Sequence, residues 1–186
     1  MSYVFDPAVL EECARAGVGL PVEEAFDAIT ARLREKYPKY VIDAPRDWVF
    51  NNAGGAMGQL TLLHGSISEY LIFFGTPIGT EGHSGRYAAV VWDFVFDGEM
   101  WCYIEGETSR TVFGPGSAAC LGSGKVKGYR VPDHAWMLEY ARGPIPGMLP
   151  FGLADSIFSV VDPRVVLRTM WNYGKLVIPN LLRGKI

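Results

Sequence analysis

The feature that most constrains the fold is the stretch 48–140, in which short runs of aromatic and β-branched residues alternate with turn signals. This spacing is typical of an antiparallel β-sandwich or β-barrel. The turn signals include the hairpin pair Asp97-Gly98 and the segments 75–77 and 79–82. The expected strands are 47–50, 57–64, 67–74, 86–96, 100–105, 109–113, 117–121, 126–130 and 134–141.

The segment before this stretch has helical periodicity instead. Asp6 followed by Pro7 predicts an N-capped helix over 6–18. A second helix is expected over 22–37, because apolar residues recur at helical spacing until Pro38 ends the pattern.

The segment after the stretch is also helical in pattern. Helices are expected over 147–160 and 163–182, with Pro179 kinking or ending the second. We therefore predict one α+β domain over 1–186. Its parts are N-terminal helices (1–40), a β-barrel (45–142) and a C-terminal helical flap (145–186).

The composition narrows the class of protein. Hydrophobic residues make up 49% of the chain, charged residues only 20%, and the mean hydropathy is +0.12. These values favour a large apolar cavity, a membrane-facing surface or an oligomer interface. The net charge of −3 and the lack of a basic run argue against nucleic acid. Three dispersed cysteines predict free thiols in a reducing compartment.

The sequence predicts neither a signal peptide nor a transmembrane helix. The last segment, however, is strongly apolar and carries Trp171 and Tyr173 with scattered basic residues. That pattern suits a helix lying at a membrane interface, or a helix packed over the mouth of the barrel. The sequence leaves both possibilities open.

One carboxylate, Glu139, lies inside the apolar run 134–140. By strand alternation it shares a face with Ala135 and Met137, whereas Trp136 and its alternate neighbours take the other face. A Glu in such a place either points to water at the strand end or faces a pocket. We favour a pocket for an apolar molecule.

Two further carboxylates, Glu69 and Asp93, also lie in apolar runs. Two acids meeting inside a barrel would share a proton, and one pKa would rise well above its usual value. Such a pair supplies an acid and a base in one dry pocket. The alternative for Asp93 is a turn cap or the solvent face of an edge strand.

Other chemistries find no support in the sequence. The histidines His64, His83 and His134 lack the spacing of a metal site. The Gly-rich segment 54–58 lacks the Lys-Ser/Thr of a phosphate loop, and no Gly-x-Ser-x-Gly motif is present. We therefore expect no metal and no cofactor.

Five motifs, taken in their order along the chain, resemble segments of the sterol delta-8 isomerase and sigma-one receptor family. They run over most of the chain, from about residue 45 to 175. The resemblance implies a cupin-like, jelly-roll β-barrel with an apolar two-helix C-terminal flap facing a membrane, and it implies a homo-trimer. The motifs are WVFNNAGGAMG (48–58), LLHGSISEY (62–70), GHSGRY (82–87), WMLEYARG (136–143) and ADSIFS (154–159).

The resemblance also implies roles for individual residues. Glu139 corresponds to the glutamate that binds the ligand cation, Asp93 to the aspartate hydrogen-bonded to it, and Tyr70 to the tyrosine that orients it. Glu139 and Asp93 are thus the expected catalytic residues. The substrate-binding residues expected beside Tyr70 are Phe74, Leu62, Val91, Trp136, Leu149, Tyr173 and His64.

Two departures from the family pattern stand out. Family members usually carry an N-terminal transmembrane helix, and this chain begins without one. We therefore expect either a truncated chain or a soluble or peripheral member, on the cytoplasmic face of a membrane or at the endoplasmic reticulum. Ala56 stands where the receptor has a large aromatic residue, so packing is expected to differ there.

The activity implied by the resemblance is the shift of a double bond in a sterol ring. A carboxyl group delivers a proton, a tertiary carbocation forms, and a carboxylate removes a proton from the neighbouring carbon. The sequence does not say which of Asp93 and Glu139 is the acid. The alternative is a non-catalytic, sigma-receptor-like protein that binds sterols or hydrophobic amines. A third possibility, an unrelated apolar ligand, gains if the two carboxylates face apart.

Overall fold

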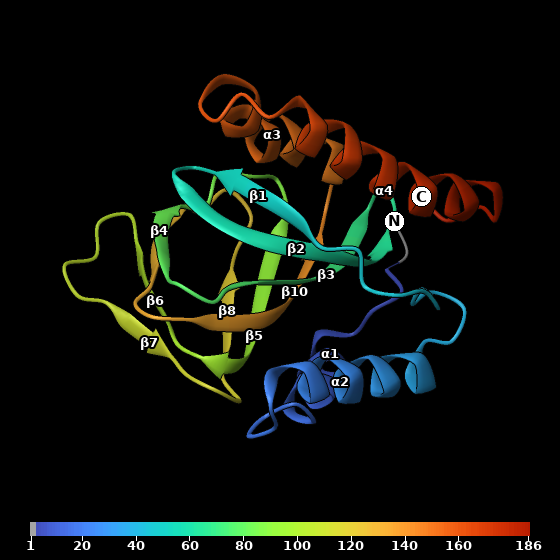
Figure 1. The fold of residues 1–186 in the computed structure, drawn as a ribbon, viewed down its shortest axis with the longest axis horizontal. Coiled ribbons are helices and arrows are strands. Elements are labelled where there is room, and N and C mark those ends of the chain that lie inside the picture. Colours follow the sequence, from blue (N-terminus) through green and yellow to red (C-terminus); the bar gives the residue numbers. More distant parts are fainter. Residues whose placement is uncertain (1–2) are drawn as a thin grey trace.

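Two antiparallel sheets form the centre of the computed structural model, which describes residues 3–186 (Figure 1). The larger sheet consists, in spatial order, of β1 (Val49–Ala53), β2 (Ala56–Gly65), β3 (Glu69–Thr76), β10 (Ala135–Arg142), β5 (Val90–Gly98) and β8 (Ala118–Leu121). The smaller sheet consists of β4 (Thr80–His83), β9 (Lys127–Val131), β6 (Met100–Ile104) and β7 (Thr111–Phe113).

The predicted α+β, jelly-roll-type fold is confirmed, with one difference. Within residues 3–186 no strand pairs across from one sheet to the other, so the barrel is not closed. The predicted Asp97-Gly98 hairpin is wrong, because β5 and β6 lie in different sheets and do not pair. Gly98, with a positive φ of 69°, instead lies where the chain passes from one sheet to the other.

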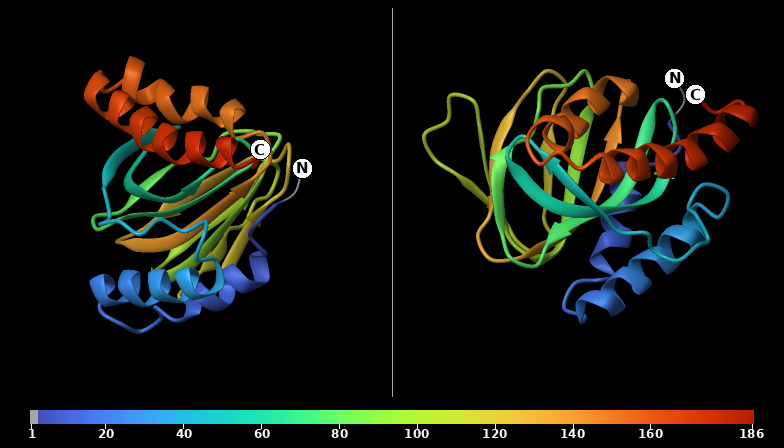
Figure 2. Two further views of the ribbon diagram at one scale, coloured as in Figure 1. Left: turned by 90° about the vertical axis from the view of Figure 1, so that its right-hand side faces the viewer. Right: turned by 45° about the horizontal axis from the view of Figure 1, so that its top comes forward.

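Helices cover the sheets on opposite sides (Figures 1 and 2). On one side lie α1 (Pro7–Arg15) and α2 (Val22–Lys36), and on the other η1 (Ile145–Met148), α3 (Leu149–Phe158) and α4 (Pro163–Leu182). Asp6 caps α1 as predicted, because its side chain accepts a hydrogen bond from the Ala8 N–H at 2.8 Å. The first two residues of the predicted segment 1–40 lie outside the described part of the chain.

Three local expectations are corrected. The segment expected as a turn at 79–82 contains the short strand β4, which is polar and is specified by its pairing with β9. Strand β5 begins at Val90 rather than at residue 86. Pro179 does not end the last helix, because α4 continues to Leu182, the end predicted for it.

The larger sheet is apolar on both faces. On its outer face, Phe26 of α2 packs edge-on against Phe73, Phe96 and Trp136, with ring centroids 4.9, 5.5 and 5.3 Å apart. Such contacts fix the helices against the sheet. The inner face carries the alternate residues, among them Met137 of β10. The alternation predicted for β10 is therefore confirmed, with Trp136 towards the helices and Met137 inside.

Glu69 is fully buried but belongs to the outer face, away from the cavity between the sheets. Its carboxylate accepts hydrogen bonds from the Val4 N–H at 2.7 Å and the Tyr140 hydroxyl at 2.8 Å. It also forms an ion pair with Lys185, 2.8 Å away. This one side chain therefore joins the N-terminal segment, the central strand and the C-terminal tail.

The substitution Glu69→Gln is expected to lower the free energy of unfolding by about 3 kcal/mol. A neutral amide has one acceptor oxygen and no charge, so it cannot serve all the donors that meet at Glu69. Chemical denaturation measures the loss, with Glu24→Gln on the exposed face of α2 as the control. Equal losses in the two variants would show that these contacts do not hold the fold together.

Candidate functional site

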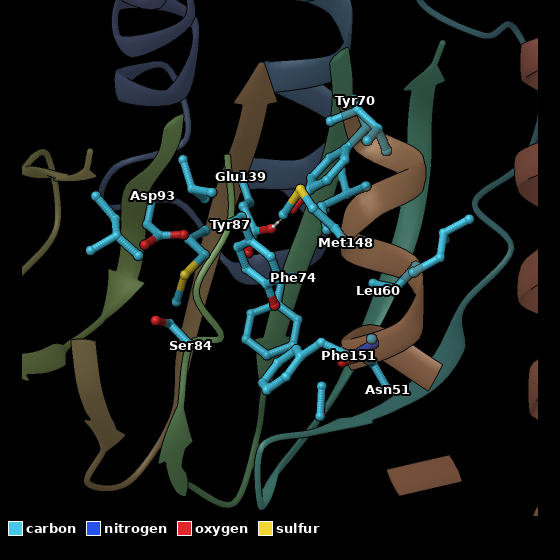
Figure 3. Close-up of a pocket in the computed structure, with 18 of the residues that line it drawn as sticks. Asn51, Leu60, Tyr70, Phe74, Ser84, Tyr87, Asp93, Glu139, Met148 and Phe151 are labelled. Atoms are coloured by element: carbon cyan, nitrogen blue, oxygen red, sulfur yellow. Dashed lines mark hydrogen bonds between the residues drawn. The ribbon is translucent and has the colours of Figure 1, made fainter. Parts of the chain in front are cut away.

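A cavity of about 200 Å³ lies between the inner face of the larger sheet, the smaller sheet and the C-terminal helices (Figure 3). Most of its wall is apolar and includes Leu60, Phe74 and Met148. Four of the ionisable side chains in this wall interact with one another. They are Tyr70, Asp93, Lys127 and Glu139.

The position of Glu139 follows from the pairing of β10. This strand lies between β3 and β5, and the register places Glu139 directly opposite Asp93. Opposite residues in antiparallel strands share a face, with Cβ atoms about 4.5–5.5 Å apart. The two carboxylates therefore enter the same cavity (Figure 3), and the arrangement in which they face apart is excluded.

Tyr70 holds Glu139 from the other neighbouring strand, β3. The Tyr70 hydroxyl donates a hydrogen bond to Glu139 Oε1 at 2.5 Å, drawn as the dashed line in Figure 3. Burial, followed by the nearby Glu139 charge, raises the pKa of Tyr70 well above its ordinary value. Tyr70 therefore remains a hydrogen-bond donor.

Lys127, on β9 in the smaller sheet, contributes the fourth group. Its Nζ forms an ion pair with Asp93 Oδ2, and the two side chains are only 9% and 4% exposed. Burial opposes the charge of Lys127, but the attraction of Asp93 prevails and its pKa is raised. The sequence analysis missed this residue. The sequence signal that could have identified it is strand alternation, which places Lys127 on one strand face with Tyr129 and Val131.

The pKa of Glu139 is raised to about 7. Burial is the largest cause, and repulsion from Asp93 acts in the same direction. The Tyr70 hydrogen bond and the charge of Lys127 lower it, without cancelling the increase. Glu139 can therefore hold or release a proton near neutral pH, as a general acid or base must.

The structure places most of the predicted substrate-binding residues around this cavity. Figure 3 shows Phe74 and Tyr70 pointing into it. Leu149 and Tyr173 contribute from α3 and α4. The predicted residues that line the cavity are Leu62, Tyr70, Phe74, Val91, Asp93, Glu139, Leu149 and Tyr173.

Trp136 and His64 do not line the cavity. Trp136 lies on the outer face of β10 and packs against Trp48, with centroids 5.5 Å apart. The register of β2 shifts between Leu62 and His64, and this irregularity carries His64 to the outer side of the sheet. There its Nδ1 lies 2.9 Å from the Tyr40 carbonyl oxygen.

The arrangement can do two things chemically. A protonated Glu139 can deliver a proton to a group in the cavity, and the charge of Asp93 can stabilise a cation that forms there. An ionised Glu139 can instead form an ion pair with a cation that enters already charged. Both depend on the apolar wall, which keeps the local dielectric low.

Comparisons with known proteins place the chain in one family. Residues 1–185 match the family model described as "ERG2 and Sigma1 receptor like protein". The C-8 sterol isomerase of Pyricularia oryzae is 43% identical, over 98% of this chain and 85% of that protein. The sigma non-opioid intracellular receptor 1 of Gallus gallus is 41% identical, over 95% and 78%. A solved RmlC-like cupin from Shewanella frigidimarina is 15% identical over 57% and 90%, with a TM-score of 0.47.

The pKa of Glu139 makes stability depend on pH. Its pKa is higher in the folded chain than in the unfolded chain, so folding takes up a proton between about pH 4.5 and 7. Across this window the wild type is expected to lose on the order of 2 kcal/mol of unfolding free energy relative to Glu139→Gln. Urea denaturation of both proteins at pH 5 and pH 8 measures the difference. Parallel pH dependence in the two proteins would contradict the raised pKa.

Proposed function

The chain belongs to the ERG2 and sigma-one receptor family, and we propose that it is a C-8 sterol isomerase that shifts a ring double bond by proton transfer. The observation that carries the proposal is Glu139, a carboxyl group that holds its proton near neutral pH and faces Asp93 in an apolar cavity. The relatives named C-8 sterol isomerase support it, since they match 98–99% of this chain at 40–43% identity.

The reaction is a balanced exchange of protons. Protonated Glu139 delivers its proton to one carbon of the double bond, whose electron pair forms the new C–H bond. The other carbon becomes a tertiary carbocation, and the negative charge of Asp93 stabilises it. A carboxylate then removes a proton from the neighbouring carbon, and the electrons of that C–H bond form the shifted double bond. The residues of this chain supply both proton transfers.

Substrate binding requires the cavity to enlarge. Its volume of about 200 Å³ is below the range of roughly 300–1,000 Å³ typical of ligand pockets. Met148 and Phe151 line it from η1 and α3, outside the two sheets. We propose that these side chains and their helices move outward when a sterol binds, while the strands carrying the ionisable groups stay in place.

The alternative function is that of a non-catalytic binding protein for sterols or hydrophobic amines. The observation that favours it is the ion-pairing capacity of Glu139, because an ammonium group carries the same charge as the carbocation. Relatives named sigma non-opioid intracellular receptor 1 match with 40–41% identity, so overall similarity does not separate the two functions.

Sterol conversion by the purified protein in lipid or detergent tests the proposal. The wild type is expected to convert a delta-8 sterol to the delta-7 isomer, and Glu139→Gln to lower kcat/KM by at least about 100-fold. The exposed Glu81→Gln serves as the matched control. Sterol products are quantified by mass spectrometry.

Binding of a hydrophobic amine separates the outcomes of that experiment. Absent turnover with tight amine binding that requires Glu139 would favour the binding protein. Amine binding that is indifferent to Glu139 would reject both functions.

We further propose that α3 and α4 contact a membrane surface as a peripheral element. Their outer side carries a row of exposed apolar residues, whereas their inner side closes the cavity through Tyr173 and Leu149. The two possibilities left open for this segment are thus compatible. No helix within residues 3–186 is long and apolar enough to span a bilayer. The exposed apolar residues are Ile157, Phe158, Val160, Val161, Leu167, Met170, Trp171, Ile178, Leu181 and Leu182.

Replacement of Trp171 and Leu182 by Glu is expected to weaken vesicle binding by at least about 10-fold, because both side chains are strongly exposed on this apolar surface. Co-sedimentation with phospholipid vesicles measures the change. Ile78→Glu, at an exposed apolar residue in the β3–β4 connection, is the control. Equal vesicle binding by the wild type, the double variant and Ile78→Glu would show that α3 and α4 do not form the membrane contact.

The homo-trimer and a location at the endoplasmic reticulum, both implied by the family, remain predictions. Light scattering coupled to size exclusion tests the first, and fractionation of the producing cell tests the second.

A further inference from the structure

The proposed reaction uses two carboxylates and a tyrosine but gives no role to Lys127. A lysine is costly to bury, and this one reaches from β9 across the cavity to Asp93 on β5. Tyr70 occupies one oxygen of Glu139 on the opposite flank. The four groups are therefore arranged as two pairs, one anion with a cation and one carboxyl with a neutral donor.

We propose that Lys127 is a positioning residue that keeps Asp93 ionised throughout the cycle, so that the cavity has one exchangeable proton and Glu139 carries it. The catalytic role in this inference rests on the proposed function, whereas the charge states of Asp93 and Lys127 do not depend on it.

The other groups that face the two carboxylates are neutral near pH 7. Tyr70 on β3, Tyr87 before β5 and Tyr129 on β9 have pKa values raised chiefly by burial. Burial also raises the pKa of Cys102 on β6 to about 11. None of these side chains carries a positive charge, so we expect no cation other than Lys127 beside Asp93 from these strands.

Two more ionisable residues complete the surroundings. His83 lines the cavity, and its Nδ1 accepts a hydrogen bond from the Gly85 N–H at 2.9 Å, which requires that nitrogen to be unprotonated. Arg142, at the end of β10, lies on the outer face of the sheet, where its guanidinium lies over the Trp92 ring, 4.8 Å from the centroid. Neither displaces Lys127 as the partner of Asp93.

This division assigns the two carboxylates different tasks. Glu139 is the acid, since Asp93 has no proton to give. After the transfer, the Lys127 ammonium still pairs with Asp93, so Glu139 is the carboxylate without a cationic partner. Glu139 therefore takes the proton from the neighbouring carbon and returns to its starting state. Asp93 acts as a fixed negative charge beside the carbocation.

The substitution Lys127→Met tests the inference through the pH dependence of kcat/KM. The wild-type value is expected to fall above about pH 7, as Glu139 loses its proton. In Lys127→Met two carboxylates face each other without a cation and hold their last proton more tightly, so the fall moves upward by about one pH unit or more. Lys127→Arg keeps the cation and is expected to leave the fall near its wild-type position.

A second readout does not require turnover. The infrared band of protonated carboxyl groups, followed against pH, is expected to titrate near pH 7 in the wild type and higher in Lys127→Met. In Asp93→Asn, Lys127 stays and the repelling charge is gone, so the band is expected to titrate below the wild type. If Lys127 had only a structural role, the two substitutions would not shift the titration of the carboxyl band in opposite directions.

The two readouts separate failure of this inference from failure of the proposed function. Infrared shifts in the expected directions without sterol conversion support the role of Lys127 and reject the isomerase. Sterol conversion with an unmoved pH profile in folded Lys127→Met overturns the role of Lys127. Should Lys127→Met not fold, Asp93→Asn decides: a downward shift supports the inference, and an unchanged or upward shift overturns it.

Discussion

The position of β10 between two neighbours is the constraint on which the rest of the structure depends. Its residues pair with β3 on one side and with β5 on the other, and all but Glu139 and Arg142 are buried. A charge placed in such a strand is unfavourable unless the neighbouring strands supply partners. Tyr70 of β3 and Asp93 of β5 lie on either side of Glu139, and Lys127 then balances Asp93 from the other sheet. The site thereby links the two sheets that no strand pairing joins within residues 3–186.

Two glutamates inside the larger sheet show how hydrogen-bond partners decide between a structural and a chemical role. Glu69 is surrounded by donors from three parts of the chain, including the Val4 N–H and Lys185. Glu139 has one neutral donor, Tyr70, and faces a second carboxylate. The first environment makes an acid a structural anchor. The second environment leaves an acid that exchanges its proton easily, and a reaction can use such a proton.

Strand alternation allowed much of the site to be predicted, because it depends only on residues close in the sequence. It placed Glu139 inside and Trp136 outside, although Trp136 was also proposed as a substrate contact. The same rule does not hold at His64, because an irregularity in β2 turns this side chain outward. Lys127 and β4 were missed for a different reason. Their roles come from pairing and packing between segments far apart in the chain, such as β9 with β5 and β4 with β9.

One cavity suits either function of the family because the same pattern of charge is reached by two routes. An amine that enters already charged pairs with an ionised Glu139 beside the Asp93–Lys127 pair. A neutral sterol that takes its proton from Glu139 becomes a cation beside the same ionised Glu139. The carbocation complex thus has the charge distribution of the amine complex, although the resting states differ by one proton. Tight amine binding is therefore what a site that stabilises this carbocation must show, whether or not a substrate is turned over.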